Sequence, residues 1–156
     1  MNIILIGIGQ SLRGDDAAGL VAVQLWQDAH PVTAQQIRVE IAENPGVGLL
    51  NLLEGTEVAI LVDAVQSGAP PGTLHCLTEK ELATFLDGAD SAHGWGIAET
   101  LALGRVIHPE RMPGQMVIIG IEIGQIEMGE RLSPKVAAVL PETVQLIQGK
   151  IKALIG

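Results

Sequence analysis

The stretch that decides the fold is NIILIGI, residues 2–8, followed by GQSLRGDD, residues 9–16. The first part is a short apolar run that ends in glycines, which is typical of a parallel strand buried on both faces. The two acids that close the second part precede apolar residues that recur at helical spacing over 17–25. This order predicts a buried strand, a tight turn and then a helix, which is the opening of a layered α/β fold.

The same alternation of strand and helix continues along the chain. It predicts further strands at 36–42, 58–63, 73–78 and 116–123, and helices at 46–53, 79–86, 95–106 and from Ser133 onward. We therefore expect a three-layer α/β/α fold with a mostly parallel, twisted, five-stranded sheet. Residues 1–156 are expected to form a single domain, because no linker or repeat divides them. Pro141 should kink or break the last helix.

Composition excludes several classes of function. The formal net charge is −9 and no run of Lys or Arg occurs, so neither a nucleic acid nor an anionic membrane is an expected partner. The apolar N-terminus lacks the basic segment of a signal peptide and soon meets acidic residues. Cys76 is the only cysteine, which fits a reducing cytoplasm. We expect Cys76 to be a small buried strand residue, with the neighbouring His75 on the opposite face.

Three polar residues are placed where a binding site is expected. Asp16 follows the first strand, Asp63 ends the third, and His93 lies in a loop before a helix. The carboxyl ends of the strands form the binding edge of a doubly wound sheet, so both carboxylates should lie there, and the loop can bring the histidine to the same side. Two carboxylates and an imidazole suit a divalent metal ion with open coordination positions. The sequence therefore predicts a metal site at this edge.

Each of these residues also has a simpler interpretation. Asp16 could be an acid in a first helical turn that complements the helix dipole, and His93 could be an ordinary surface histidine. Asp63 is harder to explain in this way, because a carboxylate after five apolar residues is costly to bury without a partner. The sequence gives little support for a nucleotide site. Leu12 interrupts the glycine pattern of dinucleotide-binding loops, and no phosphate-loop lysine follows.

At these residues the sequence resembles the maturation endopeptidases of nickel–iron hydrogenases. Their opening pattern is a strand, then G-[IV]-G-N-x-L and an acidic pair before a helix, as in GIGQSLRGDD at 7–16. Their second acid ends a strand and is followed by Ala, as in LVDAV at 61–65, and a turn like PGT at 71–73 comes next. Their histidine lies in a Ser-Pro-His loop, as in SAH at 91–93. The match spans nearly the whole chain, and the order and spacing of the motifs are fairly specific.

The resemblance implies an endopeptidase that removes the C-terminal extension of a hydrogenase large-subunit precursor after nickel insertion. It implies that Asp16, Asp63 and His93 contact that nickel, which the substrate carries, and that cadmium or zinc can occupy the site in vitro. The sequence shows no Ser, Cys or Thr nucleophile with a partnered base, so cleavage would depend on the metal. A metal can polarise the scissile carbonyl and lower the pKa of a bound water.

The sequence departs from the family's pattern in a segment that is thought to help recognise the substrate. ENPG at 43–46 replaces a Gly-Gly-Thr-like segment, and Gln10 stands where Asn is usual. Glu43 and Asn44 are therefore candidate recognition residues. Trp95 is a candidate apolar anchor for the partner, since Trp is enriched at interface hot spots, or alternatively a helix-start residue packed on the core.

Two other functions are compatible with these features. The altered loop is consistent with a non-catalytic binding or assembly protein that recognises a metal-loaded partner on the same fold. A small-molecule hydrolase or a nucleotide binder is also possible, because one fold serves many functions.

Overall fold

The computed structural model describes residues 1–10, 13–43, 46–85, 90–91, 96–124 and 131–156. The strands are β1 (Ile3–Ile8), β2 (Arg38–Ala42), β3 (Val58–Gln66), β4 (Leu74–Thr78), β5 (Asp90–Ser91) and β6 (Gln115–Glu122). The α-helices are α1 (Ala18–Ala29), α2 (Pro31–Ala34), α3 (Val47–Leu53), α4 (Glu79–Phe85), α5 (Ile97–Ile107) and α6 (Pro134–Ile155). Two short 3₁₀ turns are η1 (Gly14–Ala17) and η2 (Pro109–Arg111).

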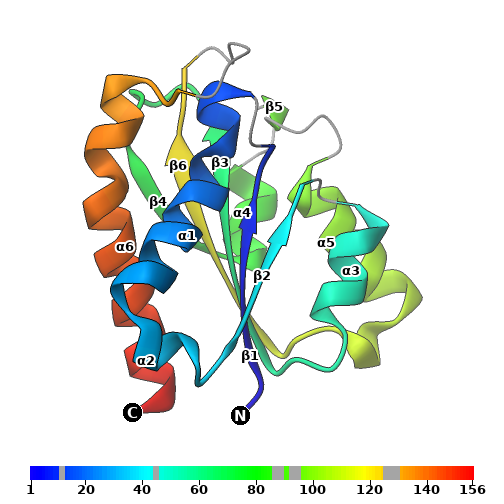
Figure 1. Ribbon diagram of the computed structural model, residues 1–156. Helices are drawn as coiled ribbons and strands as arrows, with labels where there is room; N and C mark the ends of the chain where they lie inside the picture. Colours follow the sequence, from blue (N-terminus) through cyan, green and yellow to red (C-terminus); the bar gives the residue numbers. More distant parts are fainter. Residues whose placement is uncertain (11–12, 44–45, 86–89, 92–95, 125–130) are drawn as a thin grey trace.

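The strands form one sheet in the order β2-β1-β3-β6-β4, with β3 at its centre (Figure 1). Strands β2, β1, β3 and β6 are parallel, whereas β4 pairs with β6 in the antiparallel direction. The two-residue β5 pairs with the last part of β3, where Val65 lies opposite Ser91. The expected α/β fold with a mostly parallel five-stranded sheet is confirmed, and β5 is a short addition to it.

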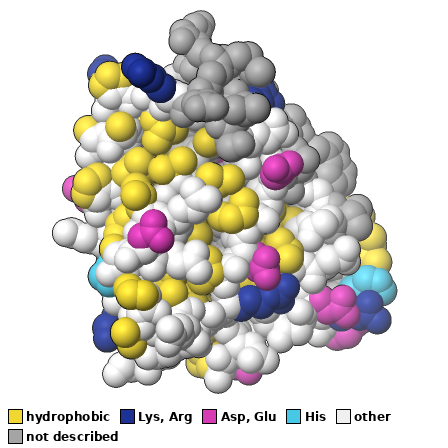
Figure 2. Space-filling view, viewed as in Figure 1, with side chains coloured by type: hydrophobic (Ala, Val, Ile, Leu, Met, Phe, Trp, Pro, Cys, Tyr) yellow, Lys and Arg dark blue, Asp and Glu magenta, His cyan; other side chains and the backbone are white. Residues whose placement is uncertain are grey.

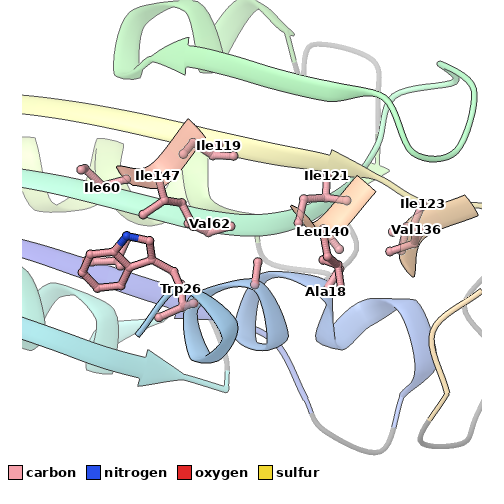
Figure 3. Packing of buried hydrophobic residues seen from close by; sticks show 14 of the residues in the cluster. Ala18, Trp26, Ile60, Val62, Ile119, Ile121, Ile123, Val136, Leu140 and Ile147 are labelled. Atoms are coloured by element: carbon pink, nitrogen blue, oxygen red, sulfur yellow. The ribbon is translucent and has the colours of Figure 1, made fainter. Parts of the chain in front are cut away.

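Helices cover both faces of the sheet. Helices α1 and α6 cover one face, and α3, α4 and α5 cover the other (Figure 1). The core under α1 and α6 includes Trp26, which is fully buried in one cluster with Val62 of β3 and Ile147 of α6 (Figure 3). Its Nε1 donates a hydrogen bond to Oε1 of Gln148 at 2.9 Å. This core therefore fixes α1, and the turn that precedes it, against the sheet.

Helix α1 approaches the sheet most directly at Gly19. A Cβ atom at this position would lie 2.2 Å from the carbonyl oxygen of Val62 and 2.7 Å from that of Ile8. Only a residue without a side chain fits between these backbones. The start of α1 is therefore packed onto the carboxyl end of β1 and the middle of β3.

Two expectations about chain geometry need correction. Strand β3 does not end at Asp63 but continues to Gln66, because β5 and β6 both supply backbone partners beyond that residue. Pro141 does not break the last helix, since α6 runs from Pro134 to Ile155. The proline is exposed, and buried apolar residues before and after it hold the helix on the core.

The expectation for Cys76 is also wrong, because this residue is exposed. Strand β4 lies at the edge of the sheet. Its side chains alternate as expected, and the neighbouring His75 is largely buried on the opposite face.

The surface seen in Figure 2 mixes apolar side chains with acidic and basic groups over α1 and α6. Apolar atoms supply more than half of the surface of a typical folded protein, so this mixture is ordinary. Within the described residues, no helix is both long enough and apolar enough to cross a bilayer.

Candidate functional site

Asp16 lies in η1, the single turn between β1 and α1, and its side chain is fully buried. The amide of Asp16 donates to the carbonyl of Arg13 at 3.0 Å, which helps to close the turn. The carbonyl of Asp16 packs against Gly9, where a Cβ atom would lie only 2.5 Å from it. The hydrogen bond within the turn and the packing of the turn on Gly9 thus hold Asp16 at the carboxyl edge of the sheet.

Asp63 lies in β3 and is 2% exposed. Its Oδ1 accepts a hydrogen bond from the amide of Ala64 at 2.8 Å. Asp63 is opposite Gly120 of β6, and it lies at the level where the neighbouring β1 ends with Ile8. Side chains alternate along a strand, and Leu61 belongs to the core under α3, α4 and α5, so the carboxylate of Asp63 is on that face.

The structure places Asp16 and Asp63 on elements that touch at one edge of the sheet. Turn η1 contacts β3 as well as α1. Gly19, three residues after Asp16, packs on the carbonyl of Val62, the residue before Asp63. His93 lies outside the described residues. Where the structure is described, no three His, Cys, Asp or Glu side chains are gathered around one possible metal position, so the three-residue site stays a prediction.

The candidate recognition residues are described only in part. Glu43 is exposed and follows β2 directly, whereas Asn44 and Trp95 lie outside the described residues. The amide of Gly9 donates to the carbonyl of Ala42 at 3.0 Å. Glu43 therefore leaves the sheet at the same edge as η1.

A pocket of about 690 Å³ opens beside η1. Its lining includes Gly14 and Asp15 of η1, Pro71 before β4, and Arg131, Ser133 and Lys135 around the start of α6. Basic side chains are visible at the N-terminal end of α6 in Figure 2. The volume is within the range of pockets that bind ligands. The carboxyl edge thus has a concave surface next to the buried acids.

Asp15 makes a long-range contact that sequence analysis does not identify. Both of its carboxylate oxygens accept hydrogen bonds from Ser133, one from the amide at 2.6 Å and one from the hydroxyl at 2.7 Å. The acidic pair and the serine before Pro134 are each visible in the sequence, but nothing there indicates that they meet. Ser133 is the N-cap of α6, as expected, although its side chain makes no cap hydrogen bond to its own helix.

Glu122 is a second buried acid that sequence analysis does not single out. It ends β6 and is 1% exposed. Its Oε2 accepts a hydrogen bond from the amide of Ser67 at 2.8 Å, and its Oε1 contacts the Ser67 hydroxyl and His75 Nε2, the latter at 3.0 Å. The pattern that marks Asp63, an acid after an apolar run at the carboxyl end of a strand, also marks Glu122.

Known proteins resemble this chain over most of its length. The family model described as hydrogenase maturation protease matches residues 44–150. The hydrogenase expression/formation protein HupD of Thiocapsa roseopersicina is 27% identical over 92% of this chain and 65% of its own length. That of Rhodobacter capsulatus is 29% identical over 86% of this chain and 64% of its own length. The chain thus spans slightly less than two thirds of these two relatives.

Solved structures show the same fold. The hydrogenase maturating endopeptidase HybD from E. coli has a TM-score of 0.81 at 22% identity and covers 98% of this chain and 93% of its own. The HybD maturation protease from Thermococcus kodakarensis has a TM-score of 0.78 at 24% identity and covers 97% of this chain and 99% of its own. The family model matches more than half of the sequence, and the chain therefore belongs to the hydrogenase maturation protease family.

Proposed function

We propose that this protein is an endopeptidase that removes the C-terminal extension of a nickel–iron hydrogenase large-subunit precursor after nickel insertion, in the cytoplasm. In this proposal the nickel belongs to the substrate and tells the enzyme which precursor to cut. The observation that carries the proposal is the placement of two buried acids, Asp16 and Asp63, on contacting elements at the carboxyl edge of the sheet. Membership of the protease family supports the reaction class.

The side chains at this edge suit a divalent ion. Asp16 and Asp63 supply the negative charge, and we propose His93 as a third, nitrogen ligand. Support for His93 comes from Ser91, which pairs with Val65 only two residues beyond Asp63. His93 comes two residues after Ser91 in the sequence. The donor set of two carboxylates and an imidazole leaves coordination positions for substrate groups.

The proposed chemistry relies on the metal, because the hydroxyls of Ser67 and Ser133 are hydrogen-bonded to carboxylates and, among the described residues, no serine is hydrogen-bonded to a histidine. Ser67 and His75 both contact the same oxygen of Glu122, so neither is arranged to activate the other. A divalent metal held by two carboxylates would supply polarisation of a carbonyl and a lower pKa for coordinated water. The protein's own acids would bind and orient the loaded precursor, whose chain would lie across the loops at this edge.

The direct test compares nickel-loaded and nickel-free precursor as substrates. We expect the wild-type enzyme to shorten only the loaded precursor, with the mass loss of the extension measured by mass spectrometry. Asp16→Asn and Asp63→Asn keep the size of each side chain but remove the charge that holds a cation, so neither variant should cut. Equal cleavage of both precursors would contradict nickel licensing, and full activity of both variants would contradict the metal site.

The alternative is a non-catalytic assembly protein that recognises a metal-loaded partner. The observation behind it is the altered segment after β2, where Glu43 is exposed at the same edge. In the same experiment this alternative predicts a stable complex with the loaded precursor and no change in its mass.

A further inference from the structure

The contact between Asp15 and Ser133 joins two parts of the chain that are 118 residues apart. Asp15 is 6% exposed, and each of its carboxylate oxygens accepts one hydrogen bond from the same serine, at 2.6 and 2.7 Å. Hydrogen bonds to an ionised acceptor are roughly twice as strong as neutral ones. Two of them from one residue fix both the position and the orientation of the carboxylate.

Ser133 is itself held by a rigid support. It is the N-cap of α6, a helix of 22 residues whose buried side chains include Val136, Leu140 and Ile147. The helix packs along α1 in the core that Figure 3 shows. The carboxylate of Asp15 lies at the positive end of the α6 dipole, which favours a negative charge there. The long helix therefore presents a fixed pair of donors to η1.

The fixed residue is the immediate neighbour of Asp16 in a single 3₁₀ turn. On its other side the turn rests on Gly9, which approaches the carbonyl of Asp16. The backbone of η1 is thus held between Gly9, which directly follows β1, and Ser133 at the start of α6. If the hydroxyl of Ser133 were removed, the turn would keep its packing on Gly9 but lose one of the two hydrogen bonds that Ser133 donates to Asp15.

We propose that Ser133 is a positioning residue: through Asp15 it orients the buried carboxylate of Asp16 toward the metal of the substrate. The inference rests on the proposed function, in which Asp16 is a metal ligand. Residues that orient metal ligands are worth roughly 10- to 100-fold in metal affinity. Ser133 acts at a distance and does not touch the ion itself.

The test measures nickel affinity by calorimetric titration of the purified protein with nickel chloride. Ser133→Ala changes no charge and keeps the amide hydrogen bond, so a weaker affinity would report orientation alone. We expect Kd to rise roughly tenfold in Ser133→Ala and to return close to the wild-type value in Ser133→Thr, which restores the hydroxyl. Hydrogen exchange of residues 13–17 should be faster in Ser133→Ala and slow again in Ser133→Thr.

A matched control separates positioning from simple stability. Thr143 is buried in the same helix, and its hydroxyl donates to the carbonyl of Val139 at 2.8 Å. Thr143→Ala should lower the melting temperature while leaving the nickel Kd unchanged. Wild-type affinity in Ser133→Ala, together with lost affinity in Asp16→Asn, would overturn the positioning role and leave the metal site standing. Equal affinity in wild type and Asp16→Asn would overturn both, and no nickel binding by wild type would overturn the positioning role, while the metal site is tested separately by cleavage of the loaded precursor.

Discussion

The carbonyl oxygen of Asp16 occupies the space that a side chain at Gly9 would need, with 2.5 Å between that oxygen and a Cβ atom built on the glycine. The Cα of Ala17 would be 3.0 Å from the same atom. Both neighbours are backbone atoms, which cannot move aside without moving the turn. The glycine at position 9 is therefore required by close approach, and its replacement should disturb the proposed site directly.

We expect Gly9→Ala to lower the free energy of unfolding by about 1–3 kcal/mol, as overpacking usually does. Processing of the loaded precursor should fall with it, because η1 must shift. The matched control is Gly149→Ala, at an exposed position of α6 where an added Cβ meets nothing within 4 Å. That change should raise stability by roughly 1 kcal/mol, since Ala is the better helix former. Urea unfolding measures both, and a stable, active Gly9→Ala would contradict the packing argument.

Asp63→Asn should separate fold from function. The amide oxygen of Asn can still accept the hydrogen bond that Ala64 donates to Oδ1. We therefore expect a change in unfolding free energy of less than about 1 kcal/mol, together with loss of precursor processing. Circular dichroism and a gel assay of the precursor give the two measurements. A variant that is unfolded would show that the carboxylate has a structural role that the amide cannot replace.

The three contacts of Glu122 predict a large effect from removing its carboxylate. Glu122→Ala would leave the amide of Ser67 and the ring nitrogen of His75 without their buried acceptor. We expect a loss of roughly 2–4 kcal/mol, because leaving buried polar groups unsatisfied costs more than the net value of the bonds. Glu122→Gln retains one acceptor oxygen and should lose less. Denaturant titration ranks the variants, and an Ala variant as stable as the Gln variant would refute the network.

Acid should weaken the start of α4. The amide of Thr78 donates to the carboxylate of Glu81 at 3.0 Å, and this bond, more than the one with the Thr78 side chain, lowers the pKa of Glu81 below its ordinary value. Glu81 therefore stabilises the folded state above its unfolded pKa, and this contribution is lost as the pH falls through the lower, folded pKa. Wild type should melt at a higher temperature than Glu81→Gln at pH 7. The two should converge on the acid side of about pH 4, and a constant difference would exclude this titration.

The sequence is sufficient to predict the layers because the central strands β1, β3 and β6 are largely apolar runs bounded by turns. The strand predicted at 58–63 has a carboxyl end that the local sequence does not predict. Its apolar residues predict a central position, which β3 has, but the extension to Gln66 depends on pairing with β5 and β6. Such pairing is set by tertiary contacts that no local pattern encodes. Pro141 is a similar case, since burial on either side of the proline outweighs its local preference.

The candidate site was predictable only to the extent that it follows strand ends. Asp16 and Asp63 were found from their places after apolar runs, and both are buried. Glu122 follows the same rule and could have been found with it. The partner of Asp15 could not, because a hydrogen bond to Ser133 spans 118 residues and depends on how α6 docks beside η1.

The link from Asp15 to Ser133 also fixes an order of events when the protein is made. A ribosome releases the two acids of η1 early, and the serine that restrains one of them emerges more than a hundred residues later. Strands β1 and β3 can pair before that moment, but the hydrogen bonds from Ser133 to Asp15 cannot form until α6 has been synthesised and docked on the sheet. The turn that carries the two acids is therefore completed last, and an unfinished nascent chain holds Asp15 and Asp16 without the hydrogen bonds from Ser133.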